Sequence, residues 1–183
     1  MFKKMLLIMS AALIISCGGA NSAPVPAPVP TPPPTSTPAA PKPAPDNVSK
    51  LSGDGWELLL PNDFQLKDVA NPSLVVVAFN NKDKRLVILS KNEFAGTVSQ
   101  YTTEAVSVFK EVGMTITSQS TGTLNSTPFA RVDGVKGPLS ISHWFLVKSN
   151  YGYTFACGGL TSSASASTHT DACNKIASNL LLK

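Results

Sequence analysis

A proline-rich stretch from Pro24 to Pro45 divides the chain and limits where a folded core can form. It holds 11 of the 15 prolines in the sequence. Because proline fixes φ and lacks a backbone N–H, this stretch can form neither a helix nor an internal strand. We expect a polyproline II stalk, at about 3.1 Å per residue and up to roughly 70 Å long, or alternatively a ligand for a proline-recognising partner or the cell wall. The folded domain is therefore expected over residues 46–183.

The residues before the stalk have the pattern of an export leader. Lys3 and Lys4 give a positively charged start, and Met5 to Ile15 is almost wholly apolar. This apolar run is shorter than the roughly 20 residues that cross a bilayer, so it fits a signal peptide better than a membrane-spanning helix. The leader closes with Ile14-Ile15-Ser16-Cys17, which resembles the lipobox of bacterial lipoproteins. Residues 1–16 are therefore predicted to be a lipoprotein signal peptide.

The lipobox resemblance implies that Cys17 is the lipid-attachment residue and that residues 17–45 form a lipid-anchored, proline-rich linker. The cysteine of such proteins carries a diacylglyceryl group, and its new N-terminus usually receives a further acyl chain such as palmitate. Each buried methylene contributes about 0.8 kcal/mol, so two or more chains give stable anchoring. Gly18 rather than Asp follows the cysteine, which favours the outer membrane if the source has two. The alternative is an ordinary secretory signal cut near Ala20 or Ala23.

The charge of the expected domain argues against a nucleic-acid partner. The whole chain has a net charge of +4, but Lys3, Lys4 and Lys42 lie before the domain. From Asp46 onward there are 12 Lys and Arg against 11 Asp and Glu, a net charge of +1. Nucleic-acid surfaces need clustered Lys and Arg, and no stretch of this domain concentrates them.

Cys157 and Cys173 are the cysteines that remain once Cys17 is assigned to the lipid. An even pair in an exported protein predicts one disulfide, which could stabilise the fold by about 3 kcal/mol in the chain-entropy model. A metal or redox pair is the alternative. The sequence has no CxxC motif and no His at ligand spacing beside both cysteines, so we expect no metal site and no cofactor.

Short apolar segments predict an antiparallel sheet. Leu74 to Asn80 is a continuous apolar run, as in a strand that is covered on both faces, and Asn81-Lys82-Asp83 is turn-like. Both alternating faces of the segment from Leu139 to Lys148 are also largely apolar. The predicted strands are Trp56 to Leu60, Leu74 to Asn80, Arg85 to Ser90, Thr115 to Thr123, Phe129 to Val135, Leu139 to Lys148 and Tyr151 to Gly158.

Two helices interrupt and follow these strands. Thr97-Val98-Ser99-Gln100 matches a capping box, and apolar residues recur at helical spacing as far as Val112, with Gly113 placed to end the helix. After a Ser/Ala-rich loop from Thr161 to Ser167, a last helix carries one apolar stripe made of Cys173, Ile176, Ala177, Leu180 and Leu181. A disulfide from Cys157 to Cys173 would fasten this helix to the sheet.

The predicted fold class is therefore α+β, an antiparallel sheet of about six or seven strands with helices packed on it. Two covered faces imply an α/β/α sandwich. Three segments resemble the Mog1/PsbP-like family: Trp56 to Pro61 with Phe64, Asn125 to Arg131, and Tyr151 to Phe155 followed by a helix that ends Ile176 to Leu180. Ser126 stands where the family usually has Gly. The resemblance implies this fold and a noncatalytic accessory or binding role, and it transfers no active-site residue.

Candidate catalytic residues are few. His143 lies on an apolar strand face and is expected to be a hydrogen-bonded core or edge residue, whereas His169 is expected to be exposed near a helix start. The sequence has no G-x-S-x-G, H-E-x-x-H or Walker motif, and Gly158-Gly159 alone is too weak a signal for phosphate binding. Four acidic residues lie close together in sequence near the first strand: Asp54, Glu57, Asp63 and Asp68. A catalytic acid pair or a calcium site would need such groups, but their spacing fits no EF-hand pattern, so we expect a solvated loop face.

Large aromatic residues are better candidates for recognition. Trp56, Trp144, Tyr151 and Tyr153 are suited to anchoring an interface if exposed, and otherwise pack under the helices. We therefore expect a noncatalytic, lipid-anchored protein of the cell envelope that binds another envelope protein and contacts the membrane through its lipid. The alternatives are an envelope hydrolase that uses His143 with a nearby carboxylate, and a carrier of a small ligand held between sheet and helix.

Overall fold

The computed structural model describes residues 48–161 and 166–183. The predicted signal peptide over residues 1–16, the lipid-attachment residue Cys17 and the linker over residues 17–45 lie outside the described residues, as does the middle of the predicted Ser/Ala-rich loop. No helix in the described ranges is long and apolar enough to cross a membrane.

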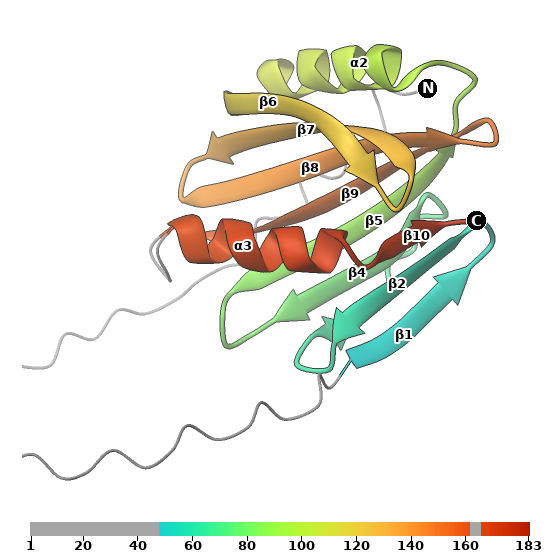
Figure 1. The fold of residues 1–183 in the computed structure, drawn as a ribbon. Helices are drawn as coiled ribbons and strands as arrows, with labels where there is room; N and C mark the ends of the chain where they lie inside the picture. The colour runs from blue at the N-terminus through green and yellow to red at the C-terminus, as the bar shows by residue number, and fades with distance from the viewer. Residues whose placement is uncertain (1–47, 162–165) are drawn as a thin grey trace, which may run out of the picture.

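The described residues form two antiparallel sheets and two helices (Figure 1). The main sheet has seven strands in the order β3-β4-β5-β9-β8-β7-β6, and a smaller sheet has the order β1-β2-β10. The elements are β1 Val48–Gly53, β2 Trp56–Pro61, β3 Gln65–Leu66, β4 Leu74–Asn80, β5 Arg85–Glu93, α2 Val98–Glu111, β6 Thr115–Leu124, β7 Thr127–Lys136, β8 Leu139–Lys148, β9 Tyr151–Leu160, α3 Ala166–Ala177 and β10 Leu180–Leu182.

The prediction of an antiparallel sheet with packed helices is confirmed, but the allocation of its strands differs. The first predicted strand, now β2, belongs to the small sheet, where it pairs with β1 on one side and β10 on the other. Its place in the main sheet is taken by β3, which has only two residues. Sequence alternation identifies a strand but not the sheet that it joins, which depends on contacts made much later in the chain.

Two tight turns set the register of two hairpins in the main sheet. Asn125 and Ser126 join β6 to β7, and Ser149 and Asn150 join β8 to β9. All four residues have positive φ, between 47° and 68°. Two-residue hairpin turns need this backbone because its twist matches that of the strands, and Asn tolerates it better than most residues. Ser126 therefore occupies a position where Gly would be less strained.

Helix α2 begins and ends as its sequence predicts. The Thr97 side chain accepts from the Gln100 backbone N–H at 3.2 Å, and the Gln100 side chain accepts from the Thr97 N–H at 2.8 Å. At the other end Gly113 has a φ of +79° and donates to the Lys110 carbonyl, while Met114 donates to the Phe109 carbonyl. This pair of hydrogen bonds is a Schellman motif, which satisfies carbonyls left free by the helix end.

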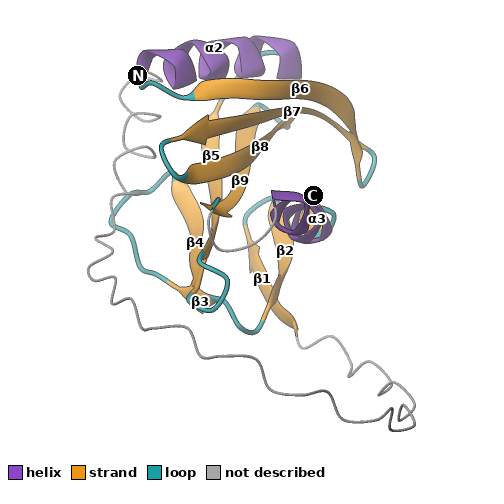
Figure 2. Cartoon of the chain, turned by 90° about the vertical axis from the view of Figure 1, so that its left-hand side faces the viewer, coloured by secondary structure: helices purple, strands orange, loops and turns teal. Residues whose placement is uncertain are grey.

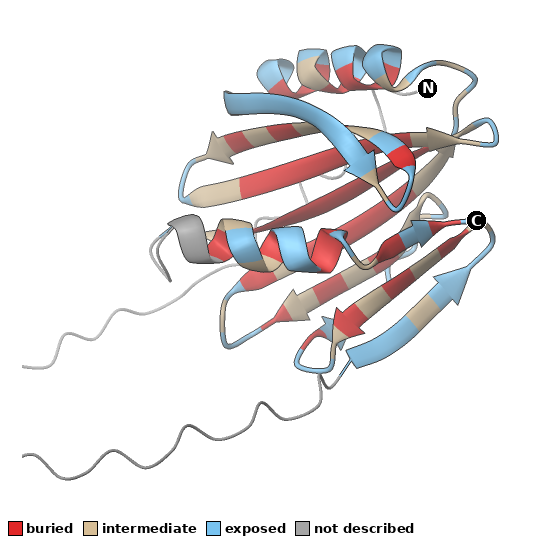
Figure 3. Cartoon of the chain, in the orientation of Figure 1, coloured by how far each residue is buried: buried red, intermediate tan, exposed pale blue. Residues whose placement is uncertain are grey.

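Each face of the main sheet carries its own hydrophobic core. Helix α2 covers one face, and α3 with the small sheet covers the other (Figures 2 and 3). The α2 core includes Tyr101, Phe109 and Phe145, and the α3 core includes Leu58 and Phe155. The predicted α/β/α layering is confirmed, with the small sheet extending the α3 layer.

The C-terminal residues correct one prediction. Leu180 and Leu181 continue the helical stripe in sequence, but α3 ends at Ala177 and both residues lie in β10. The Asn125 side-chain amide donates to the carbonyls of Ser178 and Leu180, at 3.0 and 2.7 Å. These bonds and the pairing of β10 with β2 satisfy backbone groups that a longer helix would have bonded within itself.

Replacing Thr97 by Ala removes the hydroxyl that caps α2, so we expect the free energy of unfolding to fall by about 1 kcal/mol. Urea unfolding followed by circular dichroism measures the change. Thr103→Ala is the matched control, because Thr103 is exposed within the same helix and Ala is a better helix former. Equal destabilisation by the two variants would contradict the assigned cap.

Candidate functional site

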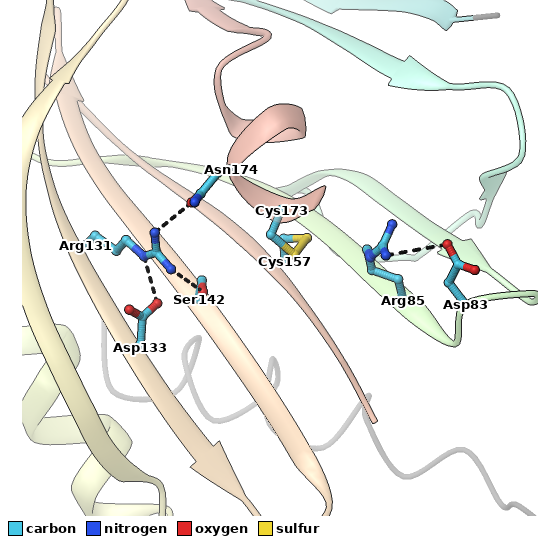
Figure 4. Close-up of a disulfide and its surroundings, with 8 residues drawn as sticks. All are labelled: Asp83, Arg85, Arg131, Asp133, Ser142, Cys157, Cys173 and Asn174. Atoms are coloured by element: carbon cyan, nitrogen blue, oxygen red, sulfur yellow. Dashed lines mark hydrogen bonds and ion pairs between the residues drawn. A yellow bond between two sulfur atoms is a disulfide. The ribbon is translucent and has the colours of Figure 1, made fainter. Parts of the chain in front are cut away.

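The predicted disulfide is present and lies between the sheet and the last helix (Figure 4). Cys157 in β9 and Cys173 in α3 have Cα atoms 5.6 Å apart. Both side chains are buried, with exposed fractions of 1% and 2%. The bond therefore holds α3 against the centre of the main sheet and is shielded from reductants in solution.

Arg131 organises a polar network beside this disulfide (Figure 4). Its guanidinium donates from Nε to Asp133 Oδ1 at 2.8 Å, from Nη1 to Asn174 Oδ1 at 2.7 Å and from Nη2 to Ser142 Oγ at 3.1 Å. It also lies over the Trp144 ring, 4.8 Å from the centroid. The network joins β7, β8 and α3, so it helps to position α3 on the sheet.

The Asp133 carboxylate is held in its charged form within this network. Burial alone would raise its pKa, but hydrogen bonds from Ser118, Ser142 and Arg131 outweigh burial and lower the pKa. The Ser118 hydroxyl donates to Oδ2 at 2.6 Å. A carboxylate that is stabilised in this way is a poor general base, because its proton affinity is low.

Sequence reasoning missed Arg131 and Asp133, although a signal was present. The two residues are two apart in a predicted strand, so they share one face of it. Opposite charges that share one face of a strand in a sheet with helices packed on it favour an ion pair, because charges that are even partly buried need a partner. That pattern could have identified the network.

Lys91 forms a second polar cluster, which ties the small sheet to the main one. Its ammonium donates to the carbonyl and the carboxylate of Asp54, at 2.9 and 2.7 Å, and lies 4.0 Å from the Tyr151 ring centroid. The hydrogen bond to Asp54 raises the Lys91 pKa, so the amine stays protonated. Burial raises the pKa of the neighbouring Tyr153 phenol. Neither group is prepared to act as a nucleophile at neutral pH.

The four candidate acidic residues do not converge on one site. Asp54 pairs with Lys91, Glu57 with Lys50 and Lys183 at 2.8 and 3.0 Å, and Asp63 accepts from the Asn80 side-chain amide at 2.7 Å. Asp68 is exposed, as are Asp54 and Asp63, in agreement with the predicted solvated face, whereas Glu57 is half-buried. Across the described residues, no group of three or more His, Cys, Asp or Glu is placed to hold a metal ion.

His143 is a core residue, as predicted. Its exposed fraction is 5%, and its ring lies 4.4 Å from Phe109 and 6.2 Å from Phe145, measured between centroids. Burial lowers its pKa to about 4, and the charge of Asp133 and the backbone at Val132 offset only part of that effect. Its Nδ1 has no well-formed hydrogen bond among the described residues, so the predicted hydrogen-bonded state is not met at that atom.

His169 corrects a prediction, because it is buried with an exposed fraction of 5% rather than exposed. Its ring lies over Gly159 in β9, where an added Cβ would approach the imidazole Cε1 to 3.1 Å. At Gly158 an added Cβ would collide with the Ser140 carbonyl and with Ile141. This glycine pair therefore allows close packing of β8 and α3 against β9, which explains its presence without a phosphate site.

The candidate recognition aromatics are mostly buried. Trp56, Trp144 and Tyr153 have exposed fractions of 6%, 3% and 2%, and only Tyr151 is partly exposed. They belong to the core beneath α3 and the small sheet or pack against it. The alternative of packing under the helices is confirmed, and a recognition surface has to be sought elsewhere.

Because the folded-state pKa of His143 is depressed, unfolding releases a histidine that takes up a proton below about pH 6.5. The contribution of the neutral His143 to stability is therefore fully present above that pH and is lost as the pH falls toward 4. We expect wild-type protein to lose on the order of 2–3 kcal/mol more than His143→Gln between pH 7.5 and 4.5. Urea unfolding at both pH values tests this, and equal losses would show that His143 is already charged in the folded state.

Comparisons with known proteins bear on the fold alone. No protein-family model matches the sequence, and no curated protein matches it. Among solved structures, the solution structure of cyanobacterial PsbP (CyanoP) from Synechocystis has a TM-score of 0.60 at 15% identity and covers 76% of this chain and 95% of its own. The crystal structure of LpqN, involved in cell envelope biogenesis of Mycobacterium tuberculosis, has a TM-score of 0.54 at 16% identity and covers 74% and 90%. The domain thus has the Mog1/PsbP-like fold that its sequence motifs resemble.

Proposed function

We propose that this chain is a bacterial lipoprotein whose PsbP-like domain is a noncatalytic accessory or binding module for another envelope protein. The lipid on Cys17 would hold the chain in the membrane, and the proline-rich linker would carry the domain away from it. A buried disulfide between Cys157 and Cys173 supports folding in an oxidising compartment outside the cytoplasm. The shared fold of LpqN, which is involved in cell envelope biogenesis, is consistent with an envelope role.

One structural observation carries the noncatalytic part of the proposal. Charged side chains with altered pKa values are engaged in holding elements together: Asp133 binds Arg131, whose guanidinium holds α3, and Lys91 with Asp54 holds the small sheet. His143 is enclosed by aromatic rings and is neutral at physiological pH. Altered pKa values often mark catalytic groups, but ion-pair networks that support a fold cause them as well.

The anchor is tested by Cys17→Ser in the full chain. Wild-type protein is expected in the membrane fraction, with an N-terminal peptide whose mass shows that Cys17 is acylated and residues 1–16 are removed. The variant has no thiol to acylate, so it should lose most of its membrane association or retain its leader uncleaved. Fractionation and mass spectrometry of the N-terminal peptide measure both. Acyl-free wild-type protein cleaved after residue 20 or 23 would support an ordinary secretory signal.

The partner is tested by crosslinking in intact cells of the source organism, followed by affinity purification and mass spectrometry. We expect one envelope protein to be captured repeatedly by the wild type and equally by His143→Gln, because a binding module does not need the buried imidazole. Capture of abundant neighbours alone would contradict the accessory role. Loss of a hydrolytic activity in His143→Gln would instead identify an enzyme.

A further inference from the structure

The two edges of the main sheet differ sharply. One edge is β3, which has two residues and is followed by Lys67, Asp68 and Pro72. The other edge is β6, ten residues long, which contains neither a charged residue nor a proline. Edge strands expose backbone donors and acceptors, and proteins usually protect them by shortness, charge, proline or a bulge. Strand β6 has only the bulge, between Ile116 and Ser118.

In the part of the chain that the structure describes, strand β6 is open along its outer side. Eight of its ten residues are exposed, and it is the pale blue strand at the edge of the sheet in Figure 3. Among the described residues it pairs with β7 alone. Beyond the bulge the pairing is regular from Ser118 to Leu124, so the outer side of this segment is an extended backbone of the kind that accepts another strand.

The turn between β6 and β7 determines which backbone groups face outward. In a two-residue hairpin the closing pair, here Leu124 and Thr127, is hydrogen-bonded to itself. Alternate residues of β6 then face β7, and the residues between them direct N–H and C=O away from it. The outward-facing residues are therefore Gln119, Thr121 and Thr123.

These three residues are arranged symmetrically about Thr121. In an antiparallel pair with a second β6, Thr121 lies opposite Thr121, and Gln119 lies opposite Thr123 on both sides. Each such pair exchanges two backbone hydrogen bonds, which gives about six in total. If the two-fold axis passed through Gln119 instead, Thr117 would have to pair with Thr121 of the second copy. The bulge displaces Thr117 from regular pairing, so this register is disfavoured.

The side chains of β6 suit a second copy of the same strand. Every opposed pair in this register is uncharged, and cross-strand pairs of hydroxyl and amide groups are stabilising, whereas opposed like charges would be destabilising. The domain from Asp46 onward has 12 Lys and Arg against 11 Asp and Glu, so two copies repel little. We propose that β6 pairs with β6 of a second copy, with Thr121 on the two-fold axis, and joins two seven-stranded sheets into one.

This contact is small, so it is weak between free molecules. Its population in the cell rests on the lipid anchoring proposed above, because confinement to one membrane raises the effective concentration of the second copy. The pairing itself does not depend on the anchor. Free protein at high concentration should therefore also pair.

Thr121→Cys tests the register directly. Opposed Cα atoms in a hydrogen-bonded antiparallel pair are about 5.5 Å apart, which lies within the range of about 4.4–6.8 Å that disulfides span. In membranes containing the full chain, mild oxidation should convert most of this variant to a disulfide-linked dimer on non-reducing gels. Ser107→Cys, which is exposed on α2, should give at least tenfold less dimer, as should the wild type.

The second variant is Thr121→Lys, which places two ammonium groups opposite each other on the axis. Each full-length protein is purified in detergent and analysed by light scattering at high concentration. The wild type and the control Ser107→Lys should be dimeric, and Thr121→Lys should associate at least tenfold more weakly. Repeating both tests in Cys17→Ser separates self-pairing from lipid anchoring. A dimer that forms in concentrated Cys17→Ser protein and dissociates on dilution would support self-pairing, whether or not the wild type is anchored by a lipid. Absence of the Thr121→Cys dimer from membranes and from concentrated protein alike would overturn self-pairing.

Discussion

The structure depends on covering both faces of one seven-stranded sheet, and the second face is the harder one to cover. Helix α2 follows β5 directly and is held by its own caps, but α3 comes after the last strand of the main sheet. The disulfide from Cys157 to Cys173 and the Arg131 bond to Asn174 fix α3 in place. Strand β10 follows α3 and completes the small sheet, so that layer depends on the position of the helix.

This arrangement explains how the polar residues are used. The charged groups on the α3 face of the sheet form hydrogen bonds between elements: Arg131 bonds to α3, and Lys91 bonds to Asp54 in the turn of the small sheet. Their environments keep Asp133 ionised and Lys91 protonated, which are the states that hold the contacts together. Among the described strands of the main sheet, β6 offers a long exposed edge for association through its backbone.

Features with a local physical cause could be predicted from sequence. The cap at Thr97, the disulfide and most strands follow from spacing and burial pattern alone. What failed depended on distant contacts. Leu180 continues a helical stripe, and contacts with the amide of Asn125 and the edge of β2 hold it in a strand instead. His169 is buried because Gly159 leaves room for its ring, which no local pattern of α3 reveals.

Hydrogen exchange read by mass spectrometry on the double variant Cys157→Ala/Cys173→Ala tests the central dependence on α3. If the disulfide fixes α3 and through it the small sheet, amides of α3, β10 and β2 should lose protection while α2 and the central strands keep theirs. Unchanged protection of α3 would show that packing alone holds the helix. An equal loss of amide protection on both faces of the sheet would also contradict a specific role for α3, because the two layers would then unfold as one unit.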